Sequence, residues 1–177
     1  MKDQGTQLLD IMCAALEIKD KMKSFYSDAA GGCGDRVGAE TFQMLRDMEQ
    51  KHIERLQQIY ADLSKGGPDL DACRFYDIEA PDRAEVMRKL KQKRETVSEA
   101  CMFDVVAIEG GMELENKGIE MFEAWLKKAS APSEREFLNH MIAEERSHYI
   151  LLADLKFYYV DTEHWFMEKS KAGLDGA

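Results

Sequence analysis

Apolar residues recur every three or four positions in four long blocks of the chain, which is the spacing of one buried helix face. The loop-forming stretches "GGCG", "SKGGPD" and "SAPSE" separate helix-like blocks, and Ser133 is the expected N-cap of the last one. The predicted helices cover residues 4–30, 37–63, 97–129 and 134–159, each with approximate bounds. Four long helices with one long connection at 64–96 predict an all-α bundle made of two helical hairpins.

The rest of the chain adds no second domain to this prediction. At 177 residues the chain is expected to form a single domain over 1–177. The second half of the 64–96 connection, "DRAEVMRKLKQKRETVSEA", has the pattern of a further helix, and residues 160–177 are assigned to a C-terminal tail.

Charge and cysteine content narrow the function classes. A formal net charge of −10 argues against nucleic acid or an anionic membrane surface as the main partner. The sequence has no apolar run of membrane-spanning length and no signal-peptide core at its N-terminus. Its four cysteines form no Cys-x-x-Cys pair, which argues against a zinc ribbon or a rubredoxin-type iron site. Reduced thiols are typical of a cytoplasmic protein, which is the expected location.

Two Glu-x-x-His motifs lie on the apolar faces of the second and fourth predicted helices. They are Glu49 with His52, and Glu145 with His148. Residues three apart share a helix face, so each pair points toward the core. A buried carboxylate and imidazole are costly unless something compensates them. One such motif is common by chance, but two copies on two helices of a bundle predict a metal site.

The two motifs are related by a fixed offset of 96 residues, and other positions follow it. Corresponding pairs are Glu17 and Glu113, Lys21 and Lys117, Phe42 and Leu138, Leu56 and Leu152, and Tyr26 and Phe122. The two halves therefore look like repeats of one hairpin. Under the same offset Lys19 corresponds to Glu115, and both lie on apolar stripes. The third helix offers an inward carboxylate where the first offers an ammonium.

These motifs resemble the rubrerythrin-like branch of the ferritin-like superfamily. The matching stretches are "MEQKH", "ELENKGIEMF", "EERSH" and the tail "HWFMEKSKAGLDGA". The resemblance implies a four-helix bundle with a carboxylate di-iron site, with zinc or manganese as other candidate metals. The metal ligands that it implies are Glu49, His52, Glu115, Glu145 and His148. It also implies a cytoplasmic oxidoreductase that reduces peroxide, and a homodimer.

The sequence departs from this family in two ways. The rubredoxin-like tail of full-length rubrerythrins is missing, so a redox cycle would need an external electron donor such as a rubredoxin. Lys19 stands where the family places the glutamate of the first helix. With Lys19 the inward charges leave a net of −2, which suits one divalent ion rather than two. We expect the ammonium at or near the first metal position, hydrogen-bonded to Glu49.

An alternative is a rotated first helix, with Lys19 reaching solvent and Glu17 or Asp20 serving as the ligand. Tyr26 is interpreted as a core tyrosine, with a position behind the metal ligands or a role as a radical residue as the alternative. His140 and His164 are interpreted as surface histidines. The basic run at 88–94 is interpreted as a solvated helix face, with docking of an acidic electron-transfer partner as the alternative.

Three functions stay open at this point. The first is a peroxide reductase with an altered site. The second is a metal-binding protein without turnover, which holds one iron, zinc or manganese ion for storage, buffering or sensing. The third is a metal-free bundle that acts as a scaffold.

Overall fold

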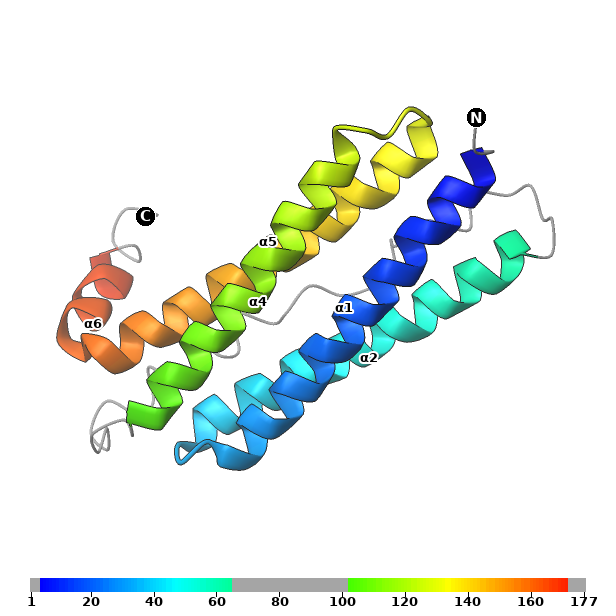
Figure 1. Ribbon diagram of the computed structural model, residues 1–177. Helices are drawn as coiled ribbons and strands as arrows, with labels where there is room; N and C mark the ends of the chain where they lie inside the picture. Colours follow the sequence, from blue (N-terminus) through cyan, green and yellow to red (C-terminus); the bar gives the residue numbers. More distant parts are fainter. Residues whose placement is uncertain (1–3, 65–101, 172–177) are drawn as a thin grey trace.

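A computed structural model describes residues 4–64 and 102–171 of the chain. These residues form five α-helices (Figure 1): α1 (Gln4–Gly32), α2 (Arg36–Ser64), α4 (Met102–Leu126), α5 (Pro132–Val160) and α6 (Thr162–Lys171). The predicted all-α class is confirmed for this part of the chain. The helix predicted within 64–96 and the basic run at 88–94 lie outside the described residues.

The four long helices pair along their lengths. α1 packs against α2 and α4 packs against α5, and α1 also contacts α4 (Figure 1). None of the described helices is both long enough and apolar enough to cross a membrane.

Two apolar clusters fill the core of the bundle. The first apolar cluster contains Met12, Leu56, Phe122 and Leu138, and the second contains Tyr26, Phe42, Ile108 and Leu152, together with their buried neighbours. Each cluster takes residues from α1, α2, α4 and α5, from opposite halves of each helix. It follows that α1 and α5 run in one direction and α2 and α4 in the other. The end of α2 at Ser64 and the start of α4 at Met102 therefore lie at opposite ends of the bundle.

The turn between α1 and α2 follows from local chemistry. Two glycines end α1, and Asp35 caps α2 by accepting the backbone N–H groups of Val37 (2.8 Å) and Gly38 (3.0 Å). The Asp35 carboxylate also accepts the hydroxyl of Tyr159 from α5, at 2.5 Å. This cap therefore fixes the turn to the second hairpin as well.

The predicted cap of α5 is wrong by two residues. Ala131, not Ser133, is the N-cap, and Pro132 is the first helical residue. Proline suits that position because it needs no hydrogen-bonded N–H and has a helical φ. The Glu134 side chain then accepts the backbone N–H groups of Ser130 (3.2 Å) and Ala131 (3.3 Å), which replaces a serine cap.

The segment assigned to a C-terminal tail contains α6. This helix turns back onto α5, and its Trp165 is fully buried in the second apolar cluster. The Trp165 ring packs edge-on against Tyr158, with centroids 5.2 Å apart. Phe166 also packs against Tyr158, and Lys169 Nζ lies 3.1 Å from Asp154 Oδ1, so α6 is held on α5 by apolar and ionic contacts together.

Candidate metal centre

A layer of charged and polar side chains separates the two apolar clusters. We call it the buried charged layer: Lys19 from α1, Glu49 and His52 from α2, Glu115 from α4, and Glu145 and His148 from α5. All six side chains have no exposed surface. The apolar spacing of the helices places them inward, and the apolar clusters on both sides seal them from water.

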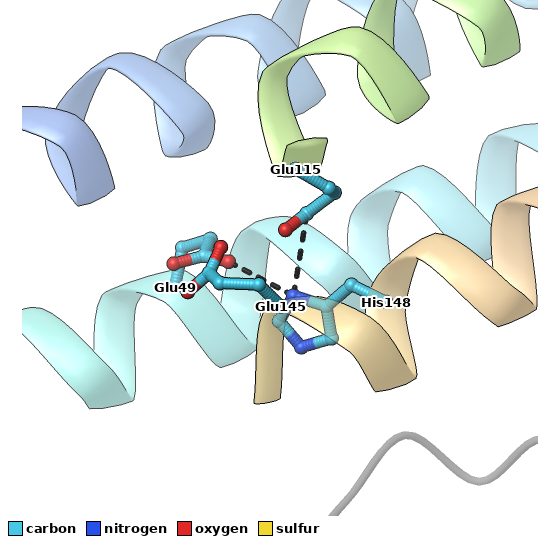
Figure 2. Close-up of side chains that lie close together, drawn as sticks. All are labelled: Glu49, Glu115, Glu145 and His148. Carbon is cyan, nitrogen blue, oxygen red and sulfur yellow. Dashed lines mark ion pairs between the residues drawn. The ribbon is translucent and has the colours of Figure 1, made fainter. Parts of the chain in front are cut away.

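Four of these side chains converge on one point. Each of Glu49, Glu115, Glu145 and His148 offers a ligand atom, and these atoms all lie within 4.8 Å of one another. Figure 2 shows the carboxylates facing the His148 ring, whose Nδ1 lies 3.1 Å from Glu49 Oε1 and 3.3 Å from Glu115 Oε1. We call these residues the four-ligand group. Carboxylate oxygens and an imidazole nitrogen are ligands for iron, manganese and zinc.

Lys19 enters the same space from α1. Its Nζ lies 2.9 Å from Glu49 Oε2 and 2.5 Å from Glu145 Oε1. The predicted contact with Glu49 is therefore present. The rotated-helix alternative is wrong, because the side chains of Glu17 and Asp20 are 69% and 72% exposed. Burial disfavours the ammonium, but the charges of Glu145 and Glu49 outweigh it and raise the Lys19 pKa above its usual value.

His52 is buried beside the four-ligand group rather than within it. Its Nδ1 lies 3.7 Å from Glu49 Oε2, and its Nε2 lies 3.5 Å from Glu144 Oε1. The ring stacks on that of His148, with centroids 5.9 Å apart and planes 9° apart. The sequence analysis did not single out Glu144. Its position three residues after Met141 on the apolar face of α5 is the signal that could have found it.

Tyr26 is both a buried core tyrosine and a neighbour of a candidate metal ligand, which agrees with the alternative of a position behind the ligands. It is fully buried, as expected, but its hydroxyl donates a hydrogen bond to Glu115 Oε1. Burial and the nearby Glu115 charge raise the Tyr26 pKa well above its usual value, so the phenol stays neutral and stays a donor. Tyr26 lies seven residues after Lys19, on the same face of α1, which is the signal for its position.

The carboxyl groups of the buried charged layer differ in pKa. Burial raises the pKa of each, but the Lys19 charge and the nearby His148 and His52 rings hold that of Glu49 well below its usual value. His148 likewise lowers the pKa of Glu115 against the effect of burial. Burial, together with the Glu115 and Glu49 charges, raises the pKa of Glu145 well above normal, although Lys19 opposes this.

These shifts describe a balanced set of charges. The lowered pKa values of Glu49 and Glu115 favour their carboxylate forms, the raised pKa of Lys19 favours its ammonium form, and the raised pKa of Glu145 disfavours ionisation of that side chain. Burial disfavours the imidazolium of His148, but Glu115 and Glu49 outweigh it and raise the His148 pKa to about 10. Without a metal ion, the carboxyl groups of the layer therefore lie against two groups that favour positive charge, the Lys19 ammonium and the His148 imidazole.

Many polar atoms of the layer lack hydrogen bonds. Among the described residues, the buried atoms without a hydrogen-bond partner include Glu49 Oε2, Glu115 Oε2, both carboxylate oxygens of Glu145, and both ring nitrogens of His52 and of His148. Some of them lie in ion pairs instead, such as Glu145 Oε1 with Lys19 and His148 Nδ1 with Glu49. Unsatisfied buried groups of this kind are costly and rare, so their concentration at one point fits a site for a bound cation.

Gly118 of α4 leaves space for the side chain of Glu145. A Cβ atom at this position would lie 3.2 Å from Glu145 Oε2 and 3.1 Å from Met22 Cε, both tighter than ordinary contacts. Glycine therefore lets the Glu145 carboxylate lie directly against the α4 backbone.

The two other histidines lie away from the centre. His164 is 68% exposed and pairs with Asp161, with His164 Nδ1 2.7 Å from Asp161 Oδ2, as expected for a surface histidine. His140 is half-buried on α5, and neither residue belongs to the four-ligand group.

Comparisons with known proteins do not assign a family. No protein-family model, curated protein or solved structure matches the chain. The residues of the buried charged layer are therefore the basis for assigning a function.

Proposed function

We propose that this protein is a rubrerythrin-like metal-binding protein that holds a divalent transition-metal ion in the core of its bundle. The four-ligand group would hold the ion. The observation that carries the proposal is the convergence of four fully buried ligand atoms within 4.8 Å, from three different helices. A protein interior accepts such a group when a bound cation compensates it.

The repeated architecture supports the family part of the proposal. The helix-surface ion pairs Glu17–Lys21 (2.7 Å) and Glu113–Lys117 (2.6 Å) occur at corresponding positions of α1 and α4. Leu56 is buried in the first apolar cluster, and its counterpart Leu152 is buried in the second. A pseudo-twofold relation between two hairpins would exchange the clusters in this way. This pattern supports a ferritin-like bundle of two repeated hairpins.

The donor set indicates the class of metal. Three carboxylates and one imidazole suit iron, manganese or zinc, and the four-ligand group contains no thiolate. A bound ion would supply Lewis acidity and, for iron or manganese, a change of oxidation state. The residues of this chain would bind and orient it. The Tyr26 hydroxyl fixes the direction of the Glu115 carboxylate, as hydrogen bonds behind metal ligands commonly do.

The test is the metal content of the purified protein by mass spectrometry, followed by titration of metal-stripped protein with Co²⁺ and Zn²⁺. We expect the wild type to bind metal and His148→Ala to bind it more than about tenfold more weakly. The exposed histidine His164 provides the control, because His164→Ala should bind like the wild type. Absence of binding by a wild type with a native circular dichroism spectrum would refute the proposal.

The balanced charges favour a second candidate, a bundle that works without metal as a scaffold. Lys19 already compensates carboxylates of the layer through its contacts with Glu49 and Glu145. The two candidates differ in thermal unfolding. Metal at about 100 times its dissociation constant stabilises a binding protein by about 2.7 kcal/mol, or about 5–10 °C for a chain of this size. A scaffold would show no shift.

A further inference from the structure

We propose that the Lys19 ammonium permanently takes the position of a second cation, so that the buried charged layer holds one divalent ion and not two. This inference rests on the proposed function and specifies the capacity of that site. Lys19 is not among the metal ligands that the family resemblance implies.

The contacts of Lys19 are those of a bridging cation. Its Nζ lies 2.9 Å from a carboxylate oxygen of α2 and 2.5 Å from one of α5, the residues Glu49 and Glu145. The whole side chain is buried, so no solvent-exposed position competes for the ammonium. A metal ion that bridged these two carboxylates would need the space in which the nitrogen lies.

The charge count leads to the same capacity. Glu49, Glu115 and Glu145 carry three negative charges when all are ionised, and the ammonium leaves a net of −2. One divalent ion neutralises that charge. A second would leave an excess of two positive charges in a fully buried layer, beside an ammonium, and the protein interior strongly disfavours such an excess.

Corresponding positions of the two hairpins show the same asymmetry. Lys19 corresponds to Glu115 in the other hairpin, and Tyr26 corresponds to Phe122. The Glu115 carboxylate receives a hydrogen bond from Tyr26, whereas the buried Phe122 offers no donor. An ammonium needs acceptors and no donor, so a phenylalanine suits the lysine half of the site. The two hairpins therefore differ at two corresponding positions and not at one. This favours a centre specialised for one ion over the isolated loss of one ligand.

The position of His52 follows from this arrangement. It would be the imidazole ligand of a second ion, yet it lies outside the four-ligand group and faces Glu144 with its Nε2. With the ammonium on Glu49, no cation is left for His52 to bind. One ion also favours metal holding or sensing over peroxide reduction, because two metal ions naturally share a two-electron reduction.

The experiment compares metal ions per chain in the wild type, Lys19→Glu and Lys21→Glu, each loaded with Zn²⁺ and measured by mass spectrometry. Lys21 makes the same charge change at a surface position two residues away. We expect one ion in the wild type, two in Lys19→Glu and one in Lys21→Glu. Two ions in the wild type, or one in a folded Lys19→Glu, would overturn the inference. Absence of metal in the wild type would instead overturn the proposed function.

A second variant keeps the inference testable if four buried carboxylates prevent Lys19→Glu from folding. Lys19→Met keeps the apolar stem and removes only the ammonium. Removing a positive charge beside the bound ion should tighten Zn²⁺ binding by at least about tenfold. Unchanged or weaker binding in a protein with a native circular dichroism spectrum would show that Lys19 does not act as a second cation.

Discussion

The hydrogen bond between Tyr26 and Glu115 allows a quantitative test of how the buried charged layer is held together. Tyr26→Phe removes the hydroxyl and leaves the ring in the second apolar cluster. Hydrogen bonds to ionised groups contribute about 1.5–3 kcal/mol net, and a buried carboxylate that loses its donor keeps its desolvation penalty. We therefore expect Tyr26→Phe to lower the free energy of unfolding by about 2 kcal/mol. The corresponding fall in melting temperature is about 4–8 °C for a chain of this size.

Tyr158 provides a matched control in the same apolar cluster. Its side chain is 1% exposed, and its hydroxyl has no hydrogen-bond partner among the described residues. Removing an unsatisfied buried hydroxyl is neutral or stabilising, so Tyr158→Phe should leave stability within about 0.5 kcal/mol or raise it. The assay is urea unfolding of metal-stripped protein in chelator, followed by far-ultraviolet circular dichroism. Equal losses in the two variants would refute the assignment of the Tyr26 hydroxyl to Glu115.

Two further predictions concern pH and the end of the bundle. Burial disfavours the imidazolium of His148, but Glu115 outweighs it and raises the His148 pKa to about 10, so a metal ion must displace a proton. Zn²⁺ binding should therefore tighten by at least about tenfold for each unit that the pH rises between about pH 6 and 8. Calorimetric titrations measure this, and an affinity that does not change with pH would contradict the prediction. Asp35→Ala removes the acceptor for the first turn of α2 and for the Tyr159 hydroxyl, and should cost about 2 kcal/mol in urea unfolding. Asp28→Ala, at an exposed position of α1, should cost much less.

The sequence was sufficient to predict the long helices and most of the site because both follow from one pattern. A charged residue at an apolar position of a helix stripe has to point inward, and Lys19, Glu115 and the two Glu-x-x-His motifs all stand at such positions. The structure confirms the expected contact of Lys19 with Glu49, whereas the contact of Lys19 with Glu145 was not predicted.

The details that the sequence did not predict depend on distances between helices. Spacing places His52 and Glu49 on the same face of α2, but which histidine joins the carboxylates depends on how the two hairpins pack. The contact of Tyr26 with Glu115 crosses from α1 to α4, which a one-dimensional pattern cannot show. The formation of α6 depends on the burial of Trp165 against α5, a tertiary effect that its weakly patterned sequence does not indicate.

Lys19 also affects the stability of the bundle in its metal-free state. A site with a fourth carboxylate in place of Lys19 would bury mutually repelling charges in the metal-free bundle, and its folding would depend strongly on metal. With Lys19, the metal-free layer already contains a cation in contact with the carboxyl groups of Glu49 and Glu145. The same ammonium then opposes a second divalent ion. Stability without metal and the capacity for two ions are therefore alternatives at this position, and the chain has the residue that favours stability.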